Sequence, residues 1–207
     1  MKDINSMDVV IVGAGAAGIG VAVVLKRMGI NFVILEKDEI GASFKKWPEE
    51  TQFISPTFTG NFFNMPDLNA VTPETSPAFN LLTEHPTGEE YQEYLQAISE
   101  FYELTIELGV SVESVQKKKG RFILATNKGE YHAQFLIWAA GEYQYPDRHA
   151  FKGAELCMHY SEVDSFEKIK TDDRIVIGAY ESGCDAAINL SREGTKVTLL
   201  DRSNSFD

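Results

Sequence analysis

The N-terminal part of the chain alternates short and long apolar segments in a pattern that predicts a βαβ unit. Val9 to Val12 is a continuous β-branched run, which is typical of a strand buried in a parallel sheet. Ala16 to Met28 is rich in Ala, Val and Leu and is followed by Gly29, so it predicts a helix that ends at a glycine. Asn31 to Leu35 is a second apolar strand, and it runs directly into Glu36.

A long segment in the middle of the chain has no such pattern. From about residue 49 to 86 it is rich in Pro, Thr, Asn and Phe without a sustained period, which predicts an irregular loop. Its aromatic residues either pack against one another in a covering loop or form a wall over a flat cofactor, and both interpretations stay open. These residues are Phe53, Phe58, Phe62, Phe63 and Phe79.

The next segment predicts a helix. Thr87 and Glu90 have the spacing of a capping box. Apolar residues then recur at helical spacing as far as Leu108, and Gly109 is expected to end the helix.

Three strands separated by glycine-containing turns are expected after this helix. We expect Trp138, at the end of the third strand, to lie in the core. The strands are Val110–Val115, Arg121–Thr126 and Tyr131–Trp138.

The C-terminal part of the chain repeats the first βαβ pattern, shifted by the 165 positions that separate Gly178 from Gly13. Strand, turn, helix, second strand and terminal carboxylate all keep their register. Two dinucleotide sites are therefore the natural hypothesis. The matching pairs are Gly13 and Gly178, Gly18 and Gly183, Leu25 and Leu190, Arg27 and Arg192, Gly29 and Gly194, and Glu36 and Asp201.

The glycines of the first turn have the spacing of a dinucleotide-binding fingerprint. Gly13 makes the tight turn after the strand, Gly15 lets the backbone approach a pyrophosphate, and Gly18 lets the helix pack on the strand. A fingerprint of this kind is weak alone, but here it follows a strand and opens a helix.

Two further features complete this first site. The start of the helix, at Ala16 and Ala17, offers unpaired N–H groups and a positive dipole end to phosphates. Glu36 stands 18 positions after Gly18, where a carboxylate can accept hydrogen bonds from ribose hydroxyls.

The second turn departs from the fingerprint. It runs from Gly178 to Gly183, but Tyr180 stands where the first turn has its middle glycine, and a side chain there limits close approach. Asp201 favours a free ribose hydroxyl and hence NADH, whereas the neighbouring Arg202 could pair with the additional phosphate of NADPH. The residues leave this choice open.

Composition and charge narrow the function classes. The 207 residues are enough for one domain or one and a half, and 43% are apolar. The formal charge of −12 argues against binding to nucleic acid or to an anionic membrane surface. The apolar run from Val9 to Leu25 is interrupted by glycines and is too short for a membrane span. Two cysteines without a framework, Cys157 and Cys184, suit a cytoplasmic protein.

Side chains alone provide no catalytic constellation. The four histidines are scattered without the spacing of metal ligands, and no metal site is expected. Chemistry carried by a bound redox cofactor needs no such constellation, because the protein then mainly binds, orients and shields. The expected partner is a small-molecule substrate.

Four segments together resemble the flavin-containing monooxygenase-like proteins of the two-dinucleotide-binding flavoprotein superfamily, close to the CzcO-type bacterial oxidoreductases. The resemblance spans almost the whole chain. The segments are Val10–Gly18 with Glu36 and Lys37; Gly41–Pro48, which contains Ser43 and Trp47; Trp138–Tyr143, which contains Ala140 and Gly141; and Gly178–Ala187, which contains Ser182 and Gly183.

The resemblance implies an α/β fold with two parts. Residues 1–148 would form a Rossmann-like FAD-binding domain with a parallel sheet and a β-meander. Residues 149–207 would begin a second Rossmann-like domain, which binds NAD(P). FAD would occupy the first site, with the Gly41–Pro48 loop near the flavin. NADPH, with NADH as the alternative, would occupy the second site, including Arg202.

The implied reaction is hydride transfer from NADPH to the flavin, then oxygen activation and transfer to a soft nucleophile or a ketone. Some residues depart from the family pattern. Val163 stands where an aromatic is expected, and His159 falls two positions late. The polypeptide of this family also continues beyond the second βαβ strand, so the sequence resembles a truncated member. A flavin-dependent reductase and a non-catalytic FAD- or adenine-nucleotide-binding module are therefore the alternatives.

Overall fold

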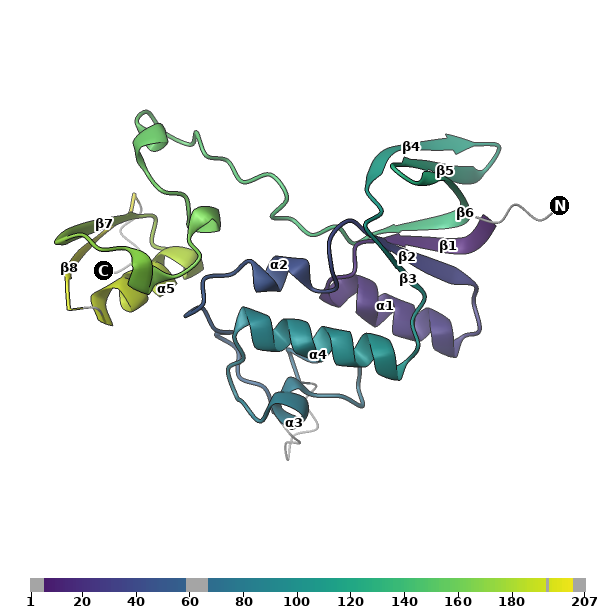
Figure 1. Ribbon diagram of the computed structural model, residues 1–207, viewed down its shortest axis with the longest axis horizontal. Coiled ribbons are helices and arrows are strands. Elements are labelled where there is room, and N and C mark those ends of the chain that lie inside the picture. The colour runs from purple at the N-terminus through teal and green to yellow at the C-terminus, as the bar shows by residue number, and fades with distance from the viewer. Residues whose placement is uncertain (1–5, 59–66, 193, 203–207) are drawn as a thin grey trace. The chain divides into compact units, whose positions relative to one another are not determined.

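The computed structural model describes residues 6–58, 67–192 and 194–202 (Figure 1). The chain forms two compact units. The first comprises Met1–Lys45 and Phe53–Tyr145, and the second comprises Lys46–Gln52 and Pro146–Asp207. Among the described residues, no helix is long and apolar enough to cross a membrane.

The first unit is built on a six-stranded sheet with the order β3-β2-β1-β6-β5-β4. Strands β3, β2, β1 and β6 run parallel, and β6, β5 and β4 form an antiparallel meander. This arrangement is the mixed α/β class with a parallel-dominated sheet that the sequence predicts. The strands are β1 (Ser6–Val12), β2 (Phe32–Glu36), β3 (Ile106–Leu108), β4 (Val112–Lys118), β5 (Arg121–Thr126) and β6 (Gly129–Trp138).

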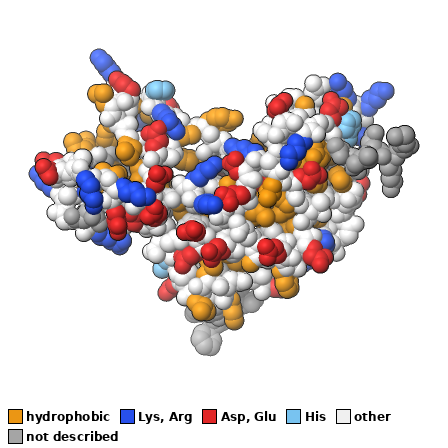
Figure 2. All heavy atoms as spheres, viewed as in Figure 1, with side chains coloured by type: hydrophobic (Ala, Val, Ile, Leu, Met, Phe, Trp, Pro, Cys, Tyr) orange, Lys and Arg blue, Asp and Glu red, His pale blue; other side chains and the backbone are white. Residues whose placement is uncertain are grey.

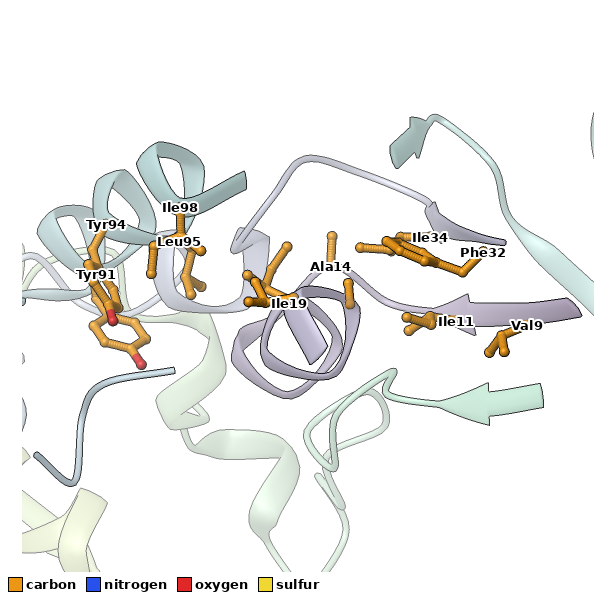
Figure 3. Packing of buried hydrophobic residues seen from close by; sticks show 12 residues of the cluster. Val9, Ile11, Ala14, Ile19, Phe32, Ile34, Tyr91, Tyr94, Leu95 and Ile98 are labelled. Carbon is orange, nitrogen blue, oxygen red and sulfur yellow. The ribbon is translucent and has the colours of Figure 1, made fainter. Parts of the chain in front are cut away.

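Four helices belong to the same unit, namely α1 (Ala16–Arg27), α2 (Ala42–Lys45), α3 (Pro77–Leu81) and α4 (Gly88–Phe101). Alternate residues of the central strands point into the helix layer, as Val9 and Ile11 do in Figure 3, where they lie on the side of Ile19. Val10 and Val12 of β1 are buried on the opposite face by the meander, in a cluster with Leu124 and Tyr131. Burial on both faces explains why β1 is a continuous apolar run.

The predicted helix after Thr87 begins with the expected capping box, but it ends earlier than predicted. Helix α4 stops at Phe101, and Glu103 adopts a left-handed conformation with φ of 47°. The N–H of Leu104 then bonds the carbonyl of Ser99, which closes the helix as a C-terminal glycine would. Residues up to Leu108 form β3 beside β2 instead, because the parallel edge of the sheet offers them a hydrogen-bonding partner.

The expectation that Trp138 lies in the core is wrong. Its side chain is 61% exposed. The meander pairs with β6 only along Gly129–Ala133, so strand β5 does not extend alongside the last residues of β6. Phe135 is exposed on the same strand for the same reason.

The aromatic residues of the irregular segment do not behave alike. Phe53 packs against Tyr91 of α4, with ring centroids 4.5 Å apart, so it follows the packing interpretation. Phe58 and Phe79 are exposed. Phe62 and Phe63 lie outside the described residues.

The second unit contains the parallel pair β7 (Asp173–Ile177) and β8 (Lys196–Leu200), joined by α5 (Glu181–Arg192). Three short 3-10 helices precede them, at Ala154–Leu156, Tyr160–Glu162 and Phe166–Lys168. Its small core consists of Val163, Phe166, Ala186 and Leu190.

On the face of the protein shown in Figure 2, acidic and basic side chains are interspersed over the surface.

The segment Lys46–Gln52 is held in the second unit by polar contacts. Glu50 accepts hydrogen bonds from the hydroxyl of Ser165 and from the N–H groups of Phe166 and Glu167. Thr51 donates to the carboxylate of Asp185 on α5, with an Oγ1–Oδ2 distance of 2.7 Å. We call this segment the strap.

Candidate dinucleotide-binding turns

The first glycine turn is fixed by the chain's own packing at Gly13 and Gly18. Gly13 has a φ of +105°, which favours glycine, and its N–H bonds the carbonyl of Leu35 at 2.9 Å. A Cβ on Gly13 would clash with the carbonyl group of Ala139. A Cβ on Gly18 would clash with the carbonyl oxygen of Gly13. The close packing of helix on strand that was predicted for Gly18 is therefore present.

Gly15 differs from these two glycines because no part of the described chain requires it. Its φ is −82°, and a Cβ there would meet nothing within 4 Å. The absence of a side chain leaves open space in front of the helix. Steric packing does not require a glycine here, although glycine is a favoured residue at a helix N-cap. The open space fits the close approach of a ligand.

The N-terminus of α1 is also free of capping within the described chain. Gly15 is its N-cap without a side-chain cap, and the first turn carries no acidic residue. The N–H groups at the start of the helix, including Ala16 and Ala17, therefore keep their positive dipole end for an anion. These features together fit a pyrophosphate at this turn.

Glu36 is buried at the end of β2 and faces the turn. Its two oxygens accept hydrogen bonds from the N–H of Ala14 at 2.7 Å and from the N–H of Asp38 at 2.8 Å. A carboxylate offers about four acceptor positions, so about two remain for ribose hydroxyls. Glu36 thus has a structural role that the sequence did not reveal, and its ribose-binding role stays a prediction.

The loop after β2 returns to the same turn. Gly41 has a φ of +70°, and its N–H bonds the carbonyl of Ala14 at 3.0 Å. Ser43 follows on α2 and is exposed. Trp47 is half-buried and belongs to the strap of the second unit, so the structure assigns Ser43 and Trp47 to different units.

Residues after β6 join the first site through a side chain that sequence reasoning missed. Gln144 accepts a hydrogen bond from Lys37 and donates one to the carbonyl of Ala140. Gly141, which lies between Ala140 and Gln144 in the chain, has a φ of +80°. Only the folded structure brings Gln144 to Lys37, since 107 positions separate the two.

The second turn has the same backbone geometry as the first. Gly178 has a φ of +100°, and its N–H bonds the carbonyl of Leu200 at 2.8 Å. A Cβ on Gly183 would clash with the carbonyl oxygen of Gly178. Ile177 pairs with Leu200 as Val12 pairs with Leu35, so the repeat keeps its strand register.

The side chains around the second turn differ from those of the first. Tyr180 is 82% exposed at the position that corresponds to Gly15, and Glu181 lies in the first turn of α5. A carboxylate at this place opposes the approach of a phosphate. Ser182 is exposed on the same turn of the helix, and Arg202 is exposed after β8.

Comparison with known proteins finds similarity over almost the whole chain. A family model described as pyridine nucleotide-disulphide oxidoreductase matches residues 10–207. An uncharacterized oxidoreductase CzcO from Bacillus velezensis is 30% identical over 205 residues, which cover 95% of this chain and 55% of the relative. The chain spans about half the length of the curated relatives it matches.

Two solved structures have a similar fold. The bacillithiol disulfide reductase Bdr from Staphylococcus aureus aligns with a TM-score of 0.75 at 26% identity, covering 99% of this chain and 61% of that protein. A flavin-containing monooxygenase from Stenotrophomonas maltophilia aligns with a TM-score of 0.71 at 21% identity, covering 95% of this chain and 58% of that protein.

Proposed function

The chain belongs to the pyridine nucleotide-disulphide oxidoreductase family, and from this premise we propose that it holds FAD at its first glycine turn and acts in monooxygenase-like chemistry driven by NAD(P)H. The observation that carries the proposal is the open space at Gly15 in front of the uncapped helix α1. Residues 1–148 would then be the FAD-binding part and residues 149–207 the beginning of the NAD(P)-binding part.

The chain's own residues supply the binding of the adenine end. The N–H groups at the start of α1 receive the diphosphate, and Glu36 accepts hydrogen bonds from the ribose. FAD held by these residues would supply the redox chemistry, namely hydride acceptance from a reduced nicotinamide and electron transfer to an acceptor. Ser43 is proposed to contact the cofactor beyond the adenine end, and Ala140 and Gly141 are proposed to lie alongside it.

The second turn is proposed to bind the nicotinamide nucleotide. The support is its shared backbone geometry with the first turn, including the clash that a side chain on Gly183 would make. Gly178 and Ser182 would lie next to the phosphates. Arg202 favours NADPH through its guanidinium group, with NADH as the alternative.

A reductase of the same family is the second candidate. The similarity to bacilliredoxin reductase Bdr of Bacillus subtilis, 27% identical over 208 residues, favours it. In either case the substrate is proposed to be a small molecule. A cytoplasmic location is also proposed, because the two cysteines of the sequence form no disulfide framework.

An anaerobic titration tests this proposal. The purified chain is reconstituted with FAD, freed of excess cofactor, and titrated with NADPH or NADH while its visible spectrum is recorded. We expect a flavin spectrum that NADPH bleaches. Admission of oxygen should then restore the colour and consume NADPH in the monooxygenase case. Bleached flavin that reacts with a disulfide but not with oxygen would identify the reductase, and a folded chain without flavin would refute both.

A further inference from the structure

Gln144 connects two segments that end beside the first glycine turn. Its Oε1 accepts a hydrogen bond from Nζ of Lys37 at 2.8 Å, and its Nε2 donates to the carbonyl oxygen of Ala140 at 2.6 Å. The amide thus uses both of its ends. We call this arrangement the Lys37–Gln144 bridge.

The strand register places the bridge across the end of β1. Val12 of β1 pairs with Leu35 of β2 on one side and with Trp138 of β6 on the other. Lys37 and Ala140 each stand two positions after these partners, so they follow the ends of the two strands that flank β1. Neighbouring strands are about 4.8 Å apart, so the bridge spans roughly 10 Å over the strand that leads into the glycine turn.

The bridge also fixes the position of the positive charge of Lys37. The ammonium group of Lys37 is held by the oxygen of a neutral amide, which orients the cation without cancelling its charge. Lys37 directly follows Glu36, whose carboxylate anchors the N–H of Ala14 in the turn. A cation fixed here adds to the positive end of the α1 dipole.

We propose that Gln144 is a positioning residue that holds the Lys37 ammonium toward the diphosphate of the bound dinucleotide. This proposal rests on the proposed function of the first turn as an FAD site. It adds that Gln144 raises the affinity of this turn for the diphosphate. The Ala140 carbonyl fixes the amide, the amide fixes the ammonium, and the ammonium attracts the phosphates.

Binding of ADP, which has the adenosine and diphosphate but no flavin, tests the proposal. Gln144→Leu keeps the size of the side chain and removes both hydrogen bonds, and Lys37→Met removes the charge. We expect each variant to raise the dissociation constants of ADP and FAD about tenfold, the scale of one charge-assisted hydrogen bond. Adenosine, which has no phosphate, should bind all forms alike. Gln134→Leu, on an exposed position of β6, is the matched control and should bind ADP as the parent chain does.

Two further readouts separate positioning from a general structural role. The double variant Lys37→Met/Gln144→Leu should be no weaker than Lys37→Met alone, because the two residues act as one unit. The dependence of ADP binding on salt should weaken in both single variants. Unchanged ADP affinity in Gln144→Leu, or additive losses in the double variant, would overturn the proposal while leaving the FAD site intact. A folded parent chain that binds neither ADP nor FAD would instead refute the proposed function itself.

Discussion

The three glycines of the first turn differ in how far the fold requires them. Gly13 and Gly18 are demanded by the fold, because a Cβ on either would clash with backbone atoms. Gly15 is not demanded by the fold, which makes it the residue that points to a ligand. The sequence predicted all three, but it could not separate them, since the spacing is the same whichever atoms fill the space.

Glu50 illustrates a carboxylate whose role is structural. Burial alone would raise the pKa of Glu50, but the hydrogen bonds from Ser165 and from the N–H of Phe166 outweigh it and hold the pKa below the ordinary value of 4.5. Ionised Glu50 therefore stabilises the strap. The sequence gives no sign of this, because its partners lie more than a hundred positions away.

We predict that Glu50→Gln lowers the free energy of unfolding of the second unit by about 1 kcal/mol at neutral pH. Because the folded pKa is depressed, the contribution of Glu50 is full above about pH 4.5 and declines as the pH falls through the folded value. Urea unfolding at several pH values measures this. Carboxyl groups of this kind are protonated by roughly pH 2 to 3. If the difference in unfolding free energy between parent and variant stays constant down to that pH, the prediction is contradicted.

At the scale of elements, the sequence pattern correctly predicted those helices and strands whose ends are determined by neighbouring residues. The capping box at Thr87, the strand Arg121–Thr126 and the repeated βαβ register are all present. The end of α4 was predicted wrongly, because a left-handed Glu103 replaced the expected glycine. The exposure of Trp138 depends on how far β5 extends, which no local pattern encodes.

The contact between the strap and α5 is likewise non-local. The Asp185 carboxylate accepts hydrogen bonds from Thr51, from the hydroxyl of Tyr160 at 2.8 Å and from the side chain of Asn189 at 2.9 Å. These bonds secure the segment that carries Trp47. Removing the carboxylate would take away the shared acceptor of three donors, and the hydroxyls of Thr51 and Tyr160, 2.8 Å apart, could replace only part of this bonding.

We therefore predict that Asp185→Ala destabilises the second unit by about 1–3 kcal/mol. It should also increase amide hydrogen exchange in the strap while leaving exchange in α1 unchanged. Asp172→Ala, at an exposed position before β7, is the matched control and should alter neither quantity. Equal protection of the strap in parent and Asp185→Ala would show that this network does not hold it.

At the scale of the whole molecule, the same βαβ backbone occurs twice, with different residues at the N-terminus of its helix. The first copy leaves its helix N-terminus open, whereas the second presents Tyr180 and Glu181 there. An open helix N-terminus favours an anion and a carboxylate there opposes one, so we expect a stronger anion site in the first unit than in the second. The two copies are therefore expected to differ in affinity despite their common backbone.

The most direct measurement is the affinity of the parent chain and of Gly15→Val for FAD, with circular dichroism and thermal unfolding recorded for both. The account predicts saturable binding of one FAD by the parent and its loss in Gly15→Val at unchanged fold, because the branched side chain fills the pyrophosphate path and its Cβ meets nothing within 4 Å. Thermal stability should fall only slightly, by about the 1 kcal/mol that a poorer helix N-cap costs. A folded Gly15→Val chain that retains FAD as the parent does would contradict the account.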